Sequence, residues 1–178
     1  MPAPSPFRIR AVQVRDAPGL SAALGAVAGE RRWLAVTSGF DERATDDFIR
    51  ANIAQANPHY VVVASPGERV VGWCDIVPSL PWDSFRHVGR LGMGLLPSWR
   101  GHGLGRELLE AAMADCERRG FLRVELEVFA SNGRAVRLYE DMGFRHEGRS
   151  VAACRLDGRW EDILHMARLM GPLRARGD

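Results

Sequence analysis

The chain contains 178 residues, of which 46% are hydrophobic and 26% charged, a composition that is ordinary for a globular protein. Its formal net charge is only +2, and its 24 basic residues, all of them arginine, are interspersed with 22 acidic ones, which argues against a nucleic-acid-binding protein. No apolar run approaches the roughly 20 residues of a membrane-spanning helix, which argues against a membrane protein.

Length and cysteine content indicate a single domain in a reducing compartment. A chain of this length buries roughly two thirds of its unfolded surface in one core, so one domain is expected over residues 1–178, with frayed tails at 1–6 and 171–178. The N-terminus lacks the apolar segment of a signal peptide, and a cytoplasmic location is therefore expected. The three cysteines, Cys74, Cys116 and Cys154, are too far apart to be metal ligands, so reduced thiols and no metal site are predicted.

Apolar periodicity and turn residues predict the elements in chain order. Asp16 is expected to cap the first helix and Gly29 to end it. The turn sequence at residues 65–68 and the Asp157-Gly158 pair each predict an antiparallel hairpin. The expected elements are a strand at 7–14, helices at 17–29 and from about 41 or 45 to 57, strands at 59–64, 69–77 and 88–96, a helix from 104 to about 119, a strand at 122–129, a helix at 132–142, and strands at 144–155 and 160–169. This order predicts an α/β fold in which helices cover a mixed sheet.

An apolar strand, a glycine-rich turn and a helix occupy residues 88–119. The N–H groups at the start of a helix lack partners and have partial positive charge, so the sequence Arg-Gly-His-Gly-Leu-Gly at 100–105 is expected to bind an anion such as phosphate. A P-loop is excluded because the chain has no lysine, and a dinucleotide fingerprint is excluded because its third glycine would fall at Leu108. A flexible connection without a ligand remains the alternative.

A second motif follows about 30 residues later, where Asn132 precedes a helix and Gly143-Phe144 follows it. Together with Arg-x-x-Gly-x-Gly at Arg100, the segment resembles the GCN5-related N-acetyltransferases, clearly over residues 59–170. The resemblance implies a single-domain, mostly antiparallel sheet with helices on both faces and splayed central strands. It also implies acetyl-CoA as the acyl donor, an amine as the acceptor, and a possible homodimer.

The resemblance also implies a binding site for the donor. The pantetheine arm would pair with the backbone of the strand at Met93, Gly94 and Leu95, and Asn132 would hydrogen bond to it. The pyrophosphate would lie beside Arg100, on the backbone of the turn. The residues of this turn are Gly101, His102, Gly103, Leu104, Gly105 and Arg106.

Two residues are expected to act in catalysis. Acyl transfer to an amine needs a proton for the departing thiolate, and a tyrosine with an ordinary pKa near 10 can supply it, so the family match favours Tyr139. The alternative is a tyrosine that only packs in the core. Glu127 lies where ribosomal-protein alanine N-acetyltransferases have their catalytic glutamate, and desolvation between separating strands would suit it as the general base. A surface glutamate paired with an arginine is the alternative, while Asp75, His87 or a water chain could take its place.

Three functions are compatible with these motifs. The stretch at residues 93–105 and the Asp157-Gly158 hairpin resemble enzymes that acetylate amino acids, amino-acid-like toxins or other small amines, and this acceptor class is favoured. The residues around Glu127 instead resemble enzymes that acetylate the N-terminal amine of a protein. A CoA-binding module without catalysis is the third possibility.

Overall fold

The computed structural model describes residues 6–176, so residues 1–5 and 177–178 of the tails expected at 1–6 and 171–178 lie outside the described residues. A seven-stranded sheet has the order β1-β2-β3-β4-β5-β7-β6, and its pairs are antiparallel except for β4 with β5. Its strands are β1 (Phe7–Ala11), β2 (His59–Ala64), β3 (Arg69–Pro78), β4 (Val88–Leu95), β5 (Arg123–Phe129), β6 (Arg145–Leu156) and β7 (Arg159–Leu169). The predicted fold class is confirmed.

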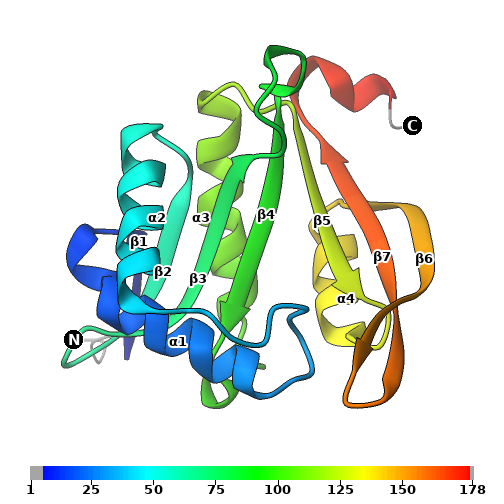
Figure 1. The fold of residues 1–178 in the computed structure, drawn as a ribbon. Helices are drawn as coiled ribbons and strands as arrows, with labels where there is room; N and C mark the ends of the chain where they lie inside the picture. The colour runs from blue at the N-terminus through cyan, green and yellow to red at the C-terminus, as the bar shows by residue number, and fades with distance from the viewer. Residues whose placement is uncertain (1–5, 177–178) are drawn as a thin grey trace.

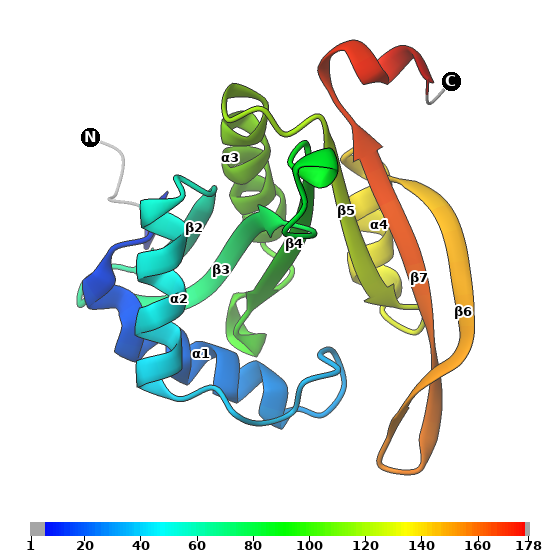
Figure 2. The same ribbon diagram turned by 45° about the horizontal axis from the view of Figure 1, so that its top comes forward.

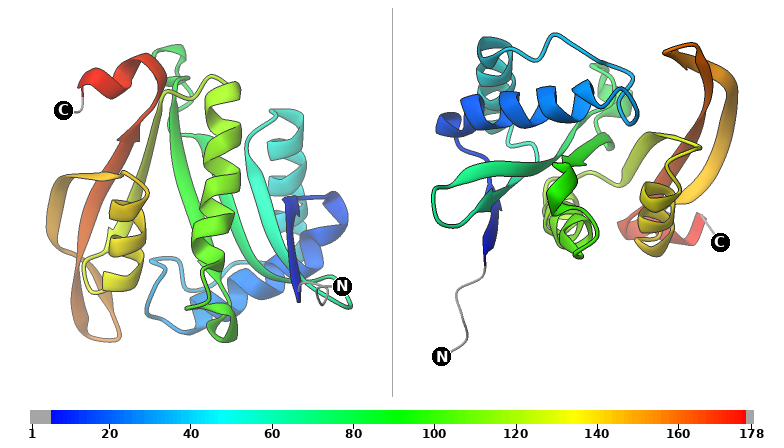
Figure 3. Two further views of the ribbon diagram at one scale, coloured as in Figure 1. Left: turned by 180° about the vertical axis from the view of Figure 1, so that it is seen from behind. Right: turned by 90° about the horizontal axis from the view of Figure 1, so that it is seen from below.

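Helices cover both faces of the sheet. They are α1 (Ala17–Gly29), α2 (Glu42–Ala54), α3 (Leu104–Arg118) and α4 (Gly133–Asp141). Figure 1 and Figure 3 show α1 and α2 on one face and α3 and α4 on the other, which we call the α1/α2 face and the α3/α4 face. Four short 3-10 helices lie at Val14–Asp16, Asp83–Phe85, Pro97–Trp99 and Gly171–Arg176. No helix in the described range is long and apolar enough to cross a membrane.

Each face has its own buried cluster because side chains alternate along the strands. Leu91 on β4 and Leu126 on β5 pack in the cluster with α3 and α4, whereas Val61 and Trp73 pack with α1 and α2. Arg90, which precedes Leu91 on β4, projects from the opposite, α1/α2 face and is exposed. The two faces therefore present different chemistry at the centre of the sheet.

The central strands separate. β4 pairs with β5 over Val88–Arg90 and Arg123–Glu125 only, and from Gly92 onward the edge of β4 has β3 as its sole strand partner among the described residues. The ribbons of β4 and β5 diverge along their length in Figure 1 and Figure 2. The expected splay is confirmed, and it leaves backbone groups of β4 available to a ligand.

Most predicted elements are confirmed to within a few residues, with three local corrections. The first strand ends at Ala11 rather than at 14, because residues 14–16 form a 3-10 helix. Asp16 does not cap α1 through its side chain, since its carboxylate accepts hydrogen bonds from Arg10 at 2.7 Å and from the Gln13 amide at 2.8 Å. At the other end, Gly171–Arg176 is a 3-10 helix where a frayed tail is expected.

Candidate active site

The turn before α3 presents a run of unpaired backbone N–H groups. Within residues 6–176, no protein acceptor bonds the five consecutive amides of residues 101–105, and the helix has no side-chain cap. Gly101 and Gly103 have positive φ values of 86° and 82°, a conformation that glycine adopts without strain. Five amides at a helix N-terminus fit an anion such as a pyrophosphate, as the sequence predicts.

Three predicted segments meet at this turn. A Cβ atom built on Gly105 would lie 3.3 Å from Leu138 of α4, 3.7 Å from Leu95 and 3.8 Å from Met93, so the turn adjoins both the open end of β4 and α4. The Arg134 guanidinium approaches the turn as well, 3.4 Å from the Cβ position of Gly101. Arg134 makes no hydrogen bond or ion pair with another described residue, so its charge is available to a second anionic group.

The side chain of Arg100 contacts residues outside the turn. Its Nη1 donates to Glu30 at 2.8 Å and its Nε donates to the Leu95 carbonyl oxygen, also at 2.8 Å. Glu30, the residue that follows α1, therefore pairs with the guanidinium, and a bound pyrophosphate beside Arg100 stays a prediction. The hydrogen bonds from Arg100 lower the pKa of Glu30. Arg100 therefore connects the turn to β4 and to the residue that follows α1.

Asn132 and Tyr139 both belong to α4. Asn132 caps this helix, as predicted, and its Oδ1 accepts from the Ala135 amide at 3.3 Å. Tyr139 is buried in the cluster that also contains Cys74 of β3, and burial, with a smaller contribution from that thiol, raises its pKa far above the ordinary value. Its ring lies 5.8 Å from that of Phe144.

The Tyr139 hydroxyl is uncommitted. It makes no hydrogen bond within residues 6–176. It is nevertheless not one of the fully buried side-chain atoms that lack a partner there, which are Arg10 Nε and His59 Nε2. The hydroxyl is therefore in contact with solvent although the side chain as a whole is 7% exposed. A protonated phenol without a protein partner can donate to a departing group.

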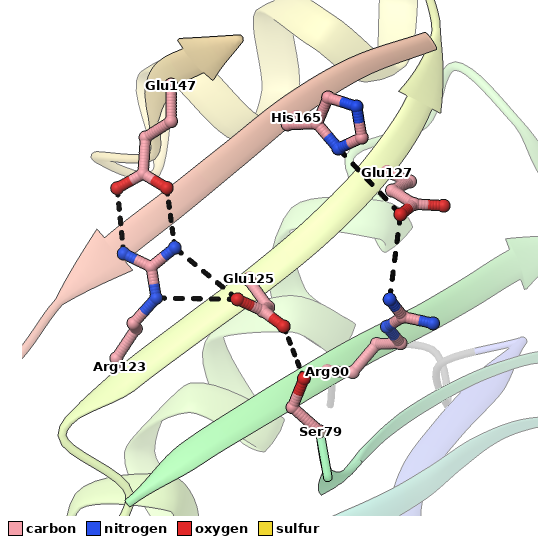
Figure 4. Close-up of polar contacts among 7 residues, drawn as sticks. All are labelled: Ser79, Arg90, Arg123, Glu125, Glu127, Glu147 and His165. Atoms are coloured by element: carbon pink, nitrogen blue, oxygen red, sulfur yellow. Dashed lines mark hydrogen bonds and ion pairs between the residues drawn. The ribbon is translucent and has the colours of Figure 1, made fainter. Parts of the chain in front are cut away.

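Charged side chains surround the split on the α1/α2 face, as Figure 4 shows. Glu127 of β5 lies 3.6 Å from Arg90 of β4 and 3.8 Å from Nδ1 of His165 on β7. The Nε2 of His165 lies 2.8 Å from the Ser150 hydroxyl. The expectation that Glu127 is desolvated is wrong, because its side chain is 49% exposed and points away from the core residues Leu126 and Val128.

These residues line a pocket of about 300 Å³. It contains both signs of charge, with Glu125 and Glu147 contacting Arg123 and with Glu125 also accepting from Ser79 (Figure 4). The lining is Arg90, Arg123, Glu125, Leu126, Glu127, Glu147, Gly148, His165 and Met166. A pocket with separate cationic and anionic groups suits a small zwitterion.

The environment of Asp75, which the sequence offers only as a substitute for Glu127, is unusual. Asp75 of β3 is 9% exposed, and burial raises its pKa to about 7. The available signal is a lone acid within the apolar strand Val-Val-Gly-Trp-Cys-Asp-Ile-Val. His87, the other named substitute for Glu127, lies before β4, where its carbonyl accepts from the amides of Leu122 and Arg123, at the paired end of the split.

The remaining histidines and cysteines have structural or exposed positions. His59 is buried and its Nδ1 lies 3.2 Å from the Asn52 amide nitrogen, while His146 contacts Glu140. Cys74 and Cys116 are buried free thiols, and Cys154 is half-buried. A search of residues 6–176 finds no group of three or more His, Cys, Asp or Glu residues that could hold a metal ion.

Comparisons with known proteins agree with this geometry. A family model described as Acetyltransferase (GNAT) family matches residues 29–144. The L-methionine sulfoximine/L-methionine sulfone acetyltransferase of Pseudomonas paraeruginosa is 25% identical over 167 residues, which are 94% of this chain and 96% of that protein. The ribosomal protein bS18-alanine N-acetyltransferase of Escherichia coli is 48% identical over 72 residues, which are 40% of this chain and 48% of that protein.

A solved structure shows the same fold. The yncA protein of Salmonella typhimurium, solved with its cofactor acetyl-CoA, superposes with a TM-score of 0.88 at 19% identity, covering 94% of this chain and 96% of that one. The family model spans well over half of the chain, including the whole turn and all of α4. The chain therefore belongs to the acetyltransferase (GNAT) family and is an acetyl-CoA-dependent acetyltransferase.

Proposed function

We propose that this enzyme transfers the acetyl group of acetyl-CoA directly to the primary amine of a small, amino-acid-like molecule. The main observation in favour is the mixed-charge pocket at the point where β4 and β5 separate, which has Arg90 for a carboxylate and Glu127 for an ammonium group. The similarity to the L-methionine sulfoximine/L-methionine sulfone acetyltransferase supports the same class, because it extends over 94% of this chain.

The donor would bind along the α3/α4 side of the split. The five unpaired amides of residues 101–105 would hold the pyrophosphate, and the free edge of β4 at residues 93–95 would pair with the pantetheine arm. The Asn132 amide nitrogen, which has no partner in the described range, would donate to the same arm. Arg134 and Arg137 at the start of α4 would bind a further phosphate.

The chemistry needs three groups. The amine must be neutral when it attacks, the oxygen of the thioester must be stabilised as it becomes negative, and the thiolate must receive a proton. We propose the Leu95 amide for the oxygen, Tyr139 for the proton and Glu127 as the carboxylate that contacts the acceptor amine. No covalent enzyme intermediate is needed, so Cys154 has no part in the reaction.

A protein N-terminal amine is the second candidate acceptor. The 48% identity to ribosomal protein bS18-alanine N-acetyltransferase favours it, but that match extends over only 72 residues. A CoA-binding module without catalysis is the third candidate. The uncommitted hydroxyl of Tyr139 argues against it, since a purely structural tyrosine would hydrogen bond to the protein.

The test is a thiol-release assay with acetyl-CoA and two acceptor sets. One set contains free amino acids and their sulfoximine and sulfone analogues, and the other contains peptides with an N-terminal alanine. We expect turnover with the first set and at least about tenfold lower kcat/KM with the second. The reverse preference would establish the protein N-terminal activity, and CoA binding in calorimetry without thiol release from any amine would establish the non-catalytic module.

We also propose a cytoplasmic, single-domain enzyme that forms a homodimer. The free thiols of Cys74, Cys116 and Cys154 support a reducing compartment. The outer strand β6 is largely exposed along its length, and the β6–β7 hairpin extends beyond the rest of the sheet in Figure 2, which supports a dimer contact there. Sedimentation equilibrium tests the dimer.

A further inference from the structure

The carboxylate of Asp75 lies across the backbone of β4 where this strand has lost contact with β5. Asp75 pairs in register with Gly92, two residues beyond the last position at which β4 pairs with β5. A Cβ atom built on Gly92 would lie 3.3 Å and 3.4 Å from the two Asp75 oxygens. The missing side chain at Gly92 therefore makes room for the carboxylate at the start of the split.

Two residues further along β4, a second glycine makes room for a side chain of β3. Trp73 pairs with Gly94, and a Cβ atom on Gly94 would lie 2.4 Å from the Trp73 indole. The indole and the carboxylate thus cover β4 from the α1/α2 face, over the two glycines that precede Leu95. This is the edge at which the proposed donor site exposes its thioester.

The Asp75 carboxylate is buried without a partner. It is 9% exposed, and neither oxygen accepts a hydrogen bond or joins an ion pair with another residue of the described range. Neither oxygen is among the fully buried atoms that lack a partner there, so the carboxylate meets solvent at the surface of the sheet. An unpaired buried carboxylate lowers the stability of a fold, which is a cost that is typical of functional sites.

Asp75 and Tyr139 approach the split from opposite faces at the same level. Cys74, which shares the buried cluster of Tyr139, pairs with Met93, and the next residue, Asp75, pairs with Gly92. A nucleophile that enters from the Asp75 side would therefore attack with the leaving thiolate on the Tyr139 side. Such an arrangement separates the group that accepts a proton from the group that donates one.

The surroundings keep Asp75 from being neutralised by an ion pair. The titratable groups next to it are His59 on β2 and Cys74 on its own strand. The charged groups on the other strands pair with one another, Arg90 of β4 with Glu127 of β5 and Arg10 of β1 with Asp16. His59 is the register partner of Asp75, but burial lowers its pKa to about 4, so the imidazole is neutral near pH 7. Arg10 already forms two hydrogen bonds with Asp16.

We infer that Asp75, rather than Glu127, is the catalytic base that takes the proton from the acceptor ammonium, an assignment that rests on the acetyl transfer proposed above. One proton passes from the ammonium to Asp75, and the neutral nitrogen forms a bond to the thioester carbon. The bond from carbon to sulfur then breaks, and the sulfur takes the phenol proton of Tyr139. The second proton lost by the nitrogen restores the phenol, and Asp75 releases its proton to solvent. Glu127, which lies beside Arg90, orients the acceptor.

The test compares Asp75→Asn with Glu127→Gln across pH. In the wild type, kcat/KM for the amine should rise with pH through a limb near pH 7, where Asp75 loses its proton. Asp75→Asn should lower kcat/KM by about 10² to 10⁴-fold at pH 7, abolish this limb and leave the Kd for acetyl-CoA within about twofold. Glu127→Gln should raise the acceptor KM and keep the limb.

A control and an independent readout complete the design. Asp115→Asn removes another buried carboxylate, which pairs with Arg118 and Arg119 on α3, and should leave the pH profile unchanged. The infrared carboxyl band of isotope-labelled Asp75 in the wild type should titrate near pH 7. The assignment is overturned if that band stays ionised from pH 5 to 8, or if Asp75→Asn keeps the limb while Glu127→Gln loses it. A wild type that releases no thiol with any amine would instead refute the proposed function itself.

Discussion

The two faces of the sheet use different kinds of group at the split between β4 and β5. On the α3/α4 face, backbone amides of the turn at residues 101–105 and one buried phenol, Tyr139, surround the proposed donor site. On the α1/α2 face, polar and charged side chains from four strands, including Arg90, Glu127 and His165, surround a pocket. If the proposed sites are correct, backbone groups bind the donor and side chains select the acceptor.

This difference gives the two faces separable effects in experiments. A change on the α3/α4 face should alter donor affinity or the chemical step with any acceptor. A change on the α1/α2 face should alter acceptor discrimination and leave donor affinity intact. Variants of the phenol, the turn, the pocket and the contact between the two faces test this separation.

Tyr139→Phe should produce the largest effect, a fall of about 100-fold in kcat, because the thiolate loses its proton donor. Acetyl-CoA affinity should stay within about twofold. The melting temperature should change little, since the hydroxyl makes no hydrogen bond in the described range. Stopped-flow thiol release, calorimetry and thermal melting provide the three measurements.

The chain offers a matched control in Tyr60, its second tyrosine, which lies half-buried on β2 near Asp115. Tyr60→Phe should leave kcat unchanged. Equal losses of kcat in the two variants, or a collapse of donor affinity in Tyr139→Phe, would contradict a catalytic phenol and identify a structural one.

Gly103→Ala should weaken acetyl-CoA binding by about tenfold, because a side chain at φ +82° shifts the amides that bind the pyrophosphate. Gly120→Ala is its control at the other end of α3, where φ is +85° and, as at Gly103, no atom lies within 4 Å of the new Cβ. Both variants should lose about 1 kcal/mol of stability. Calorimetry should show weaker donor binding in Gly103→Ala alone, and equal affinities would exclude the turn as the anion site.

The sequence predicts the proposed donor site on the α3/α4 face well, because its features are local in the chain. Glycines at positive φ, an unpaired helix start and a capping asparagine are local features, so Gly103 and Asn132 could be placed from their neighbours in the chain. The alternation of apolar residues likewise located nearly every strand. The sequence could not predict which side chains pair over long distances in the chain. One example is Arg100, whose partner Glu30 is 70 residues away.

On the α1/α2 face, the sequence alone does not predict the surroundings of the side chains. Sequence similarity pointed to Glu127, but only the strand register reveals that it stands exposed between Arg90 and His165. The same register brings Asp75 over Gly92. Periodicity alone cannot identify this pairing, because it depends on which strands are neighbours.

Glu127→Gln should raise the acceptor KM by about 3- to 10-fold and leave the Kd for acetyl-CoA unchanged, because exposed ion pairs contribute modestly. The effect should shrink in high salt, which screens the attraction between the carboxylate and an ammonium group. Steady-state kinetics at two salt concentrations measure it. An equal effect on donor binding would show that the two faces are not separable.

The contact between Glu30 and Arg100 links the faces, and Glu30→Gln should produce the smallest effect. Arg100 lowers the pKa of Glu30, so the ionised carboxylate adds stability above its unfolded pKa of about 4.3, and this stability is lost as pH falls through the lower folded pKa. With side chains 22% and 25% exposed, the loss should be at most about 1 kcal/mol at pH 7, or roughly 2 to 4 °C in melting temperature. Asp46→Asn, which breaks an exposed pair on α2, should shift it less. A Glu30→Gln deficit that persists below pH 4 would show that packing, not charge, joins α1 to the turn.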